Sequence, residues 1–344
     1  MSPSTSLISA KDAKPPFYFG LDVGGTNIKI GLVDDTGKTL AYHTMPTEQD
    51  KGAENACVRM AKVVAELIER AGIARSDVAR AGIATPGPMD IRAGMILRPG
   101  NLPGWWDFPI RDRLASHLNM PVTFANDANA AAYGEFWLGA GAAYDSLVLL
   151  TLGTGIGGGI IVRDTLVDGA HSCGGERGHI LVNPAKDAWQ DSLGKSGSLE
   201  AYANAGAVIR RATDALGASE ASTLARRHRT GEPITPRMVA EEAERGDALA
   251  RNVVMETAYW LALGIVTFVH TIDPDAVVLG GAMNFGGPTS PLGREFLQRI
   301  SDEVRPRLLE PLRGVVKIEF ATLGGDAGYI GAAGLARLEQ RKLI

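Results

Sequence analysis

A short glycine-rich segment that occurs twice constrains the fold of this chain more than any other feature. Residues 21–26 read LDVGGT, and residues 150–155, which follow them by 129 positions, read LTLGTG. Each segment lies between two apolar runs of strand length, and Val33 and Val162 end the two copies. A strand, a glycine turn and a second strand, repeated at domain distance, indicate a duplicated unit. Two unrelated hairpins with glycine turns are the alternative.

Length and composition exclude several classes of protein. The 344 residues are enough for about two domains of roughly 150 residues each. Hydrophobic residues make up 45% and charged residues 22%, as in soluble globular proteins, which argues against a disordered chain. The formal net charge is −4 and there is no basic run, so we expect no nucleic-acid partner. Cys57 and Cys173 cannot form a disulfide framework, which favours the reducing cytoplasm.

No segment is expected to cross a membrane or to direct secretion. The apolar run at residues 258–269 is shorter than the roughly 20 residues that a membrane-spanning helix needs. The first residues lack the apolar stretch of a signal peptide. We therefore expect a cytoplasmic protein with no membrane partner, in which residues 1–16 form a flexible leader.

Alternating strands and helices predict an α/β protein. The expected strands cover residues 17–22, 28–33, 38–43, 80–84, 121–125, 146–152, 160–163, 275–279 and 315–320. The expected helices cover residues 54–71, 128–138, 200–216, 236–245, 247–271, 292–309 and 328–340.

The two glycine turns suit phosphate binding. A turn without side chains lets backbone N–H groups approach a phosphate closely. The first turn follows Asp22, whose carboxylate at a strand end can hold Mg²⁺ through water. Residues 153–158 also match the pattern G-x-G-x-x-G, but the strand-like residues 160–162 follow where a dinucleotide-binding fold requires a helix. Two facing turns would instead clamp a nucleotide between two domains.

Seven motifs in a fixed order carry a family resemblance. Residues 21–29, 150–159 and 277–281 resemble the two phosphate motifs and the adenosine motif of sugar kinases on the actin-like ATPase fold. Between and after them come TPG at 85–87, NLPGW at 101–105, NDAN at 126–129 and GERGH at 175–179. From about residue 17 to the end, the chain resembles the ROK family (repressors, open reading frames, kinases), especially its glucokinase-like members.

The resemblance implies a fold and a division into domains. It predicts an α/β, two-domain actin-like ATPase (ribonuclease H-like) fold with a duplicated β-meander plus helices. Residues 17–138 and about 328–344 would form a smaller N-terminal domain, and residues 139–327 a larger C-terminal domain. The nucleotide and the sugar would bind in the cleft between them.

The resemblance also implies a substrate site. Asp127 would be the general base that takes the proton of the sugar hydroxyl; an aspartate that only caps a helix is the alternative. His179 could equally be a structural histidine. The residues implied in sugar binding are Gly87, Asn101, Asn126, Asp127, Glu176, His179 and Glu200.

The implied activity is that of an ATP-dependent hexose kinase that converts glucose to glucose 6-phosphate. Other implied substrates are N-acetylmannosamine, N-acetylglucosamine, allose and fructose. A sugar-sensing transcription regulator is a less favoured alternative, because only about 16 residues precede the first strand. The family implies Mg²⁺ held by Asp22 through water, and a homodimer. The residues implied in nucleotide binding are Asp22, Gly24, Gly25, Thr26, Asn27, Lys29, Gly153, Thr154, Gly155, Gly280 and Gly281.

One stretch departs from the family pattern. Members of the family usually carry a zinc-binding segment C-x-C-G-x-x-G-C-x-E, and residues 191–200 read DSLGKSGSLE at that place. Asp191, Leu193 and Ser198 occupy the three cysteine positions, whereas structural zinc needs about four nitrogen or sulfur ligands. We expect a loop without structural zinc, held by packing of Leu193 and Leu199 and by hydrogen bonds of Asp191 and Ser198.

Overall fold

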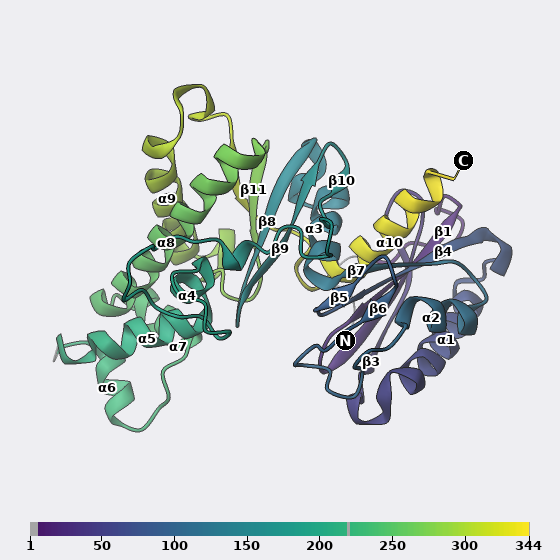
Figure 1. Ribbon diagram of the computed structural model, residues 1–344, viewed down its shortest axis with the longest axis horizontal. Helices are drawn as coiled ribbons and strands as arrows, with labels where there is room; N and C mark the ends of the chain where they lie inside the picture. The colour runs from purple at the N-terminus through teal and green to yellow at the C-terminus, as the bar shows by residue number, and fades with distance from the viewer. Residues whose placement is uncertain (1–5, 219–220, 344) are drawn as a thin grey trace.

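The computed structural model describes residues 6–218 and 221–343, and two five-stranded mixed sheets organise them (Figure 1). The first sheet has the order β3-β2-β1-β4-β7, and the second has the order β10-β9-β8-β11-β12. The strands of the first sheet are β1 (Phe17–Val23), β2 (Asn27–Val33), β3 (Thr39–Pro46), β4 (Val78–Thr85) and β7 (Val122–Asn126). Those of the second are β8 (Ser146–Leu152), β9 (Ile156–Val162), β10 (Thr165–Leu166), β11 (Ala276–Gly280) and β12 (Lys317–Phe320), and a separate pair is β5 (Met89–Asp90) and β6 (Met95–Ile96).

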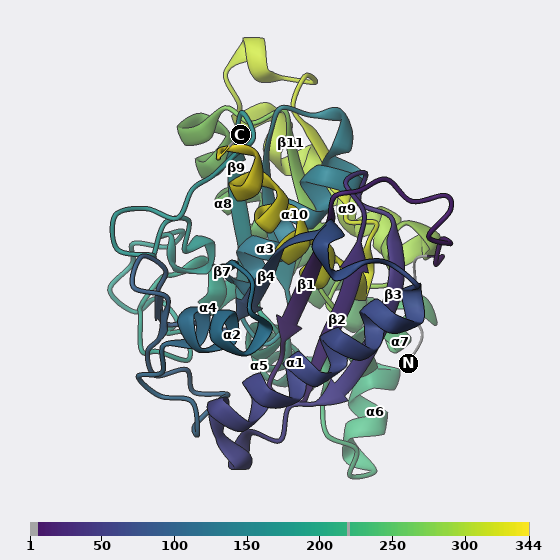
Figure 2. The ribbon, with the colours of Figure 1, turned by 90° about the vertical axis from the view of Figure 1, so that its right-hand side faces the viewer.

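Helices cover the sheets and join them. They are α1 (Gly52–Ala71), α2 (Ile110–Leu118), α3 (Asp127–Leu138), α4 (Leu199–Ala203), α5 (Ala205–Ala215), α6 (Thr223–Arg229), α7 (Pro236–Glu244), α8 (Ala248–Ile272), α9 (Pro291–Val304) and α10 (Ala327–Arg341). Figure 2 shows α1 and α2 in front of the first sheet.

The two sheets are copies of one topology. Strand β1 is antiparallel to β2 and parallel to β4, and β8 is likewise antiparallel to β9 and parallel to β11. Adding the 129 positions of the sequence repeat to the first and last residue numbers of β1 and β2 gives those of β8 and β9. The α/β fold with a duplicated meander is therefore confirmed.

The two copies exchange their last helices. Helix α3 follows β7 of the first sheet and packs against β9 of the second, whereas α10 follows β12 of the second sheet and packs against β1 and β4 of the first. The exchange brings backbones into contact at glycines. A Cβ atom on Gly331 of α10 would lie 1.6 Å from the carbonyl oxygen of Ala130, and one on Gly20 of β1 would lie 1.7 Å from that of Tyr329. Only glycine fits at either position.

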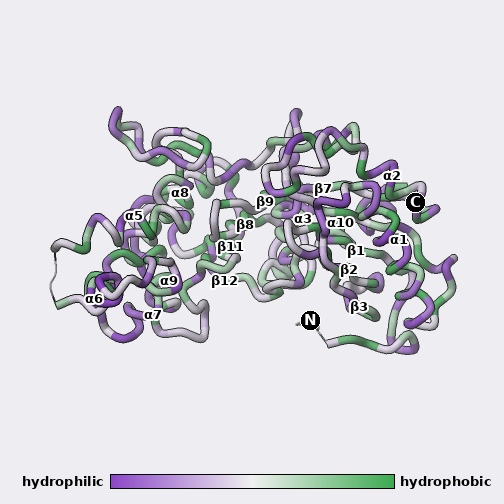
Figure 3. Tube along the Cα trace, turned by 90° about the horizontal axis from the view of Figure 1, so that it is seen from below, coloured by the Kyte–Doolittle hydropathy of each residue, from purple (hydrophilic) through white to green (hydrophobic). Residues whose placement is uncertain are grey.

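Each sheet has its own apolar core, and hydrophobic segments follow the strands and α8 (Figure 3). Helix α8 spans 25 residues and is long and apolar enough to cross a membrane by length and composition. The expectation that no segment could span a membrane considered only the apolar run at residues 258–269, whereas the whole helix, expected at residues 247–271, passes this test of length and composition. More than half of its most apolar window is buried inside the protein, as expected for a core helix.

Part of the expected flexible leader is attached to the first sheet. The backbone N–H of Ile8 donates to the carbonyl of Thr39, and that of Lys14 donates to the Asp34 carboxylate, both at 2.9 Å. Ile8 also packs against the core of the first sheet. Residues 1–5 of the expected leader lie outside the described residues.

Several expected elements differ from the structure. The expected helix at 200–216 is two helices, because the side chain of Asn204 accepts from the N–H of Ala207 and starts α5. The strand expected at 160–163 begins at Ile156, so the second glycine turn is shorter than expected. The helix expected at 292–309 ends as an α-helix at Val304. The sequence did not predict α2, α6 or the pair β5–β6.

Candidate active site

Two aspartates lie at the same edge of the first sheet. Asp22 belongs to the end of β1, and Asp127 directly follows β7; β1, β4 and β7 run parallel, so their carboxyl ends share one edge. Burial raises the pKa of Asp22 to about 6, the charge of Asp127 adds to this rise, and Lys29 opposes it. Burial also raises the pKa of Asp127, to which the charge of Glu176 contributes. The charges of Asp127 and Glu176 thus act in turn on Asp22 and on Asp127.

Asp127 is the first residue of α3, but Asn126 is the residue that caps this helix. The Asn126 side chain accepts from the N–H groups of Ala128 at 3.0 Å and Asn129 at 3.2 Å. Asp127 Oδ1 accepts from the N–H of Ala128 at 2.8 Å. Because Asn126 already caps the helix, a purely capping role for Asp127 would be redundant.

The first glycine turn is closed by its own backbone and by one threonine. The N–H of Gly24 donates to the carbonyl of Asn27 at 2.9 Å, and Thr47 Oγ1 donates to the carbonyl of Gly24 at 2.7 Å. A Cβ atom on Gly25 would lie 3.3 Å from the carbonyl oxygen of Asn101. The turn expected to bind phosphate therefore lies against the loop expected to bind sugar.

The other residues of the first turn point in different directions. Thr26 and Asn27 are exposed at its tip. Lys29 lies on β2 opposite Asp22, and its Nζ donates to the carbonyl of Gly325 just before α10. A Cβ atom on Gly328 of α10 would lie 2.4 Å from Asp22 Oδ2, so the Asp22 carboxylate rests on the start of that helix.

The second glycine turn is tied to Glu200. A Cβ atom on Gly155 would lie 2.6 Å from Glu200 Oε2, and this oxygen accepts from the N–H of Ile156 at 2.8 Å. Ser192 donates to Glu200 Oε1 at 3.3 Å. Glu200 is 8% exposed, and its two carboxylate oxygens link the loop at Ser192 to the second glycine turn.

A pocket of about 510 Å³ opens beside the second turn. Gly153 and Thr154 line one part of it, and Met283 and Phe285 line another. Gly280 ends β11 inside the sheet, and Gly281, with a φ of 90°, turns the chain toward this pocket. Two backbone segments and an apolar wall of this size fit a purine base with its ribose.

The remaining candidate residues come from loops around the two aspartates. Gly87 lies next to Asn126, with 3.7 Å between its would-be Cβ and Asn126 Nδ2. Glu176 directly precedes the short turn Arg177–His179, His179 is the last residue of this turn, and both are exposed. The structure therefore brings Gly87, Asn126, Asp127 and Glu176 together with Asp22, whereas Glu200 faces its own domain.

Comparison with known proteins decides the family. The chain matches the ROK family over residues 18–339. It is 33% identical to a glucokinase of Halalkalibacterium halodurans, over 95% of this chain and 97% of that protein. The chain belongs to the ROK family.

Solved structures agree with this assignment. The ROK hexokinase from Thermus thermophilus superposes with a TM-score of 0.81 at 33% identity, covering 95% of this chain and 99% of that one. A ROK family glucokinase from Streptomyces griseus in complex with glucose and AMPPNP superposes with a TM-score of 0.72 at 33% identity, covering 94% and 99%.

In this ROK protein, Asp191 organises the loop that departs from the family's zinc pattern. Its carboxylate accepts from the N–H groups of Leu193 at 2.9 Å and Lys195 at 2.8 Å, and from Ser198 Oγ at 2.8 Å. His179 Nδ1 lies 3.2 Å from the same carboxylate. Among the described residues, no group of three or more His, Cys, Asp and Glu side chains comes together as metal ligands.

The expected packing of this loop was only partly correct. Leu199 is fully buried, but Leu193 is 67% exposed, so its side chain does not pack the loop as expected. The backbone of Leu193 contributes to the loop, because its N–H donates to Asp191. Gly194 and Gly197 both have a φ of 75°, as the tight turns require.

Two contributors to the site of this ROK protein were not found from the sequence. Thr47 holds the first turn, and Asn204 Nδ2 donates to the carbonyl of Thr154 at 3.0 Å to hold the second. Asn204 sits where a helix was expected to continue, and its preference for helix starts is a signal that was available. Thr47 follows Pro46 at a strand end and carries no local signal of this kind.

Proposed function

We propose that this ROK protein is an ATP-dependent hexose kinase that forms glucose 6-phosphate from glucose. The observation that carries the proposal is the pair Asp22 and Asp127 at one sheet edge, in the same structure as two equivalent glycine turns. One carboxylate suits a cation beside a phosphate chain, and the other suits proton acceptance from an alcohol. The likeness to a glucokinase and to a structure with glucose and AMPPNP supports glucose as the sugar.

In the proposed reaction, Asp127 accepts the proton of the sugar 6-hydroxyl. The freed oxygen forms a bond to the γ-phosphorus of ATP, and the bond between that phosphorus and the β,γ-bridging oxygen breaks to leave ADP. Burial, which raises the pKa of Asp127, makes this carboxylate a better proton acceptor than an exposed aspartate. Catalysis in such a transfer is mainly positioning and charge stabilisation.

The nucleotide and the sugar would occupy separate parts of the cleft. The base and ribose fit the pocket at Met283 and Phe285, with the phosphates near the turns at Gly24 and Gly153. The sugar hydroxyls would bond Asn101, Asn126, Glu176, His179 and Glu200, for which Glu200 must exchange one of its present partners.

Mg²⁺ fits the acidic edge near the first turn. Asp22 would hold it through water, since a carboxylate at the end of β1, beside the first glycine turn, is a suitable outer ligand. When bound, Mg²⁺ neutralises charge on the phosphates during transfer.

A coupled assay for ADP tests the function directly. The purified protein is supplied with Mg-ATP and with glucose, mannose, fructose, allose, N-acetylglucosamine or N-acetylmannosamine in turn. We expect the highest kcat/KM with glucose. A preference for an N-acetylhexosamine would move the assignment to another kinase of the family, and no ADP release with any sugar would leave a sugar-binding regulator.

The cytoplasm as location and the homodimer are further parts of the proposal. The family resemblance supports the dimer, and two cysteines without a disulfide partner fit a reducing compartment. Sedimentation equilibrium of the 36.3 kDa chain would give about twice that mass for a dimer.

A further inference from the structure

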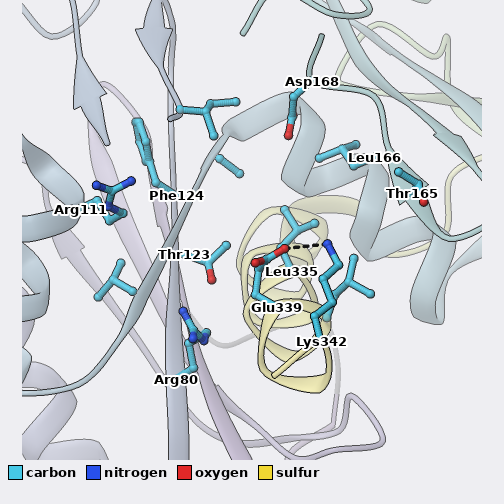
Figure 4. Close-up of a pocket in the computed structure, with 14 residues that line it drawn as sticks. Arg80, Arg111, Thr123, Phe124, Thr165, Leu166, Asp168, Leu335, Glu339 and Lys342 are labelled. Carbon is cyan, nitrogen blue, oxygen red and sulfur yellow. Dashed lines mark hydrogen bonds and ion pairs between the residues drawn. The ribbon is translucent and has the colours of Figure 1, made fainter. Parts of the chain in front are cut away.

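A second pocket, of about 340 Å³, lies away from the nucleotide pocket and shares no lining residue with it. Its walls come from β4 and β7 of the first sheet, from the last turns of α10, and from β10 with the loop after it (Figure 4). Strand β7 is the edge of its sheet and β10 is the edge of the other, so the pocket sits where the two halves meet. Its volume is within the range of small-molecule sites.

One wall presents polar donors that have no partner. Gly82 of β4 pairs with Thr123 of β7, and Arg80 lies two positions before Gly82, so Arg80 and Thr123 share one face of the sheet. Arg80 Nε and Thr123 Oγ1 are buried without a hydrogen-bond partner in the described part of the chain. Leaving such donors unpaired is costly, which indicates that a ligand or water satisfies them.

The opposite wall adds a further cation. Lys342 lies across the pocket directly after α10, and it forms an ion pair with Glu339 at 2.8 Å (Figure 4). Arg111 also lines the pocket, but it is bonded to Asp112 at 2.8 Å and to the carbonyl of Arg92 at 2.9 Å. Arg80 can therefore bond an anion directly, and Lys342 can do so by exchanging Glu339, which also lines the pocket, while Arg111 contributes positive charge nearby.

The rest of the pocket suits a polyol more than a bare anion. Asp168 Oδ1 accepts from Asn129 Nδ2 at 3.2 Å, which leaves its other oxygen to accept from a hydroxyl. Thr165 adds a hydroxyl group, and Leu166 and Leu335 add apolar surface for the C–H groups of a ring. A phosphate bound between Arg80 and Lys342 would place an attached sugar toward Asp168.

We propose that this pocket binds a small phosphorylated sugar and that its occupation regulates the enzyme. A ligand that bonds both β7 of the first sheet and Asp168, which follows β10 of the second sheet, would hold the two sheets in one relative position. Asp168 is bonded to Asn129 in the first turn of α3, two residues after Asp127, so the ligand would act on the helix that carries the proposed base. The regulatory part rests on the proposed kinase function, whereas the binding part does not.

Calorimetry with glucose 6-phosphate tests the site. The titration is made with the whole protein saturated with glucose and AMPPNP, so that the active site is closed to the titrant. We expect one further molecule bound per chain, with affinity at least ~10-fold weaker in Arg80→Gln or Lys342→Gln because each removes a charge-assisted hydrogen bond. Thr123→Val, which keeps the side-chain shape, should weaken binding less, and Arg229→Gln on the exposed end of α6 should leave it unchanged.

Two further titrants separate the chemical classes. Inorganic phosphate should bind more weakly than glucose 6-phosphate, and glucose alone should show no second site. Equal binding of phosphate and the sugar phosphate would overturn the sugar assignment, and no second site, or one indifferent to Arg80→Gln and Lys342→Gln, would overturn the site itself.

Kinetics tests the regulation separately. Glucose 6-phosphate should change kcat in a way that glucose does not relieve, and Arg80→Gln should remove this effect while its basal rate stays as in the wild type. Inhibition that is purely competitive with glucose would overturn regulation through the pocket. Failure of the kinase proposal would instead appear as absent ADP release, without any bearing on the calorimetric result.

Discussion

The charge of Asp127 raises the pKa of Asp22, adding to the larger effect of burial, although the two residues lie 105 positions apart in the chain. The parallel run of β1, β4 and β7 creates this proximity, because it brings the ends of β1 and β7 to one edge. Two neighbouring carboxylates that both resist ionisation are unfavourable for the empty protein. A cation beside Asp22 and a proton donor beside Asp127, as in phosphate transfer to an alcohol, would offset this cost.

Loss of the proposed base should affect turnover much more than binding. Asp127→Asn is expected to lower kcat by at least ~10²-fold, because no other carboxylate takes the proton. Glucose binding, measured by calorimetry, should weaken far less, since Asn101, Asn126 and Glu176 remain. Asn126 still caps α3, and burial raises the pKa of Asp127, so the melting temperature at neutral pH should not fall below that of the wild type. Turnover near the wild-type rate would remove Asp127 from the mechanism.

The buried carboxylate of Asp22 should lower the free energy of unfolding at neutral pH. Its folded pKa, about 6, lies above the ordinary value of 3.8, so the stability contributed by the neutral carboxyl is fully present below pH 3.8 and is lost as the pH rises through 6. Asp22→Asn should therefore melt at a higher temperature than the wild type at pH 7.5 without Mg²⁺, and the difference should vanish near pH 4.

The same substitution should abolish most activity with Mg-ATP. Asp187→Asn, an exposed aspartate on a loop of the larger half, serves as the control and should change neither property. A lower melting temperature for Asp22→Asn at pH 7.5 would show that the ionised Asp22 stabilises the fold, which would contradict a cost of ionising this buried carboxyl.

The second glycine turn offers a clean test of the nucleotide pocket. A Cβ atom on Gly153 meets nothing within 4 Å, so Gly153→Val should fold normally while its side chain enters the pocket. We expect the KM for ATP to rise at least several-fold and the affinity for glucose to stay unchanged. Gly217→Val, at another glycine with open space, is the matched control. An unchanged KM for ATP would place the nucleotide elsewhere.

The sequence predicts the fold where a local pattern repeats. The turns at Gly24 and Gly153 and the strands around them are visible because alternating apolar runs and glycines are local signals, and the repeat adds a second copy as a check. Helix α2 (Ile110–Leu118) was missed because it is short and only Ile110, Leu114 and Leu118 are buried.

Tertiary contacts explain what the sequence does not show about the site. Glu200 fits a sugar-binding motif, but its bonds to Ile156 and Ser192 depend on how a distant loop returns to β9. The buried donors of Arg80 and Thr123 likewise appear only when β4 and β7 are paired. Such relationships are set by the register of strands far apart in the chain, which no local pattern encodes.

Asp191 should replace a metal in holding the loop that carries His179. Burial of its carboxylate works against ionisation, but hydrogen bonds from Lys195, Ser198, Leu193 and His179 hold the pKa of Asp191 below its ordinary value. A lowered pKa means that this stabilisation is present above pH 3.8 and is lost as the pH falls below it. Asp191→Ala should cost about 1–3 kcal/mol of unfolding free energy at pH 7, because it leaves the buried Ser198 hydroxyl and two part-buried N–H groups without their acceptor.

The same variant should raise the KM for glucose more than it lowers kcat, because His179 loses its orientation while Asp127 keeps its place. Asp187→Ala, at an exposed residue four positions earlier in the chain, should do neither. In the wild type, activity should survive prolonged treatment with a zinc-selective chelator once Mg²⁺ is restored. Elemental analysis should find far less than one zinc per chain, since His179 and Asp191 are short of a four-ligand structural site. A stoichiometric zinc whose removal lowers the melting temperature would show that the metal, and not the Asp191 carboxylate, holds this loop.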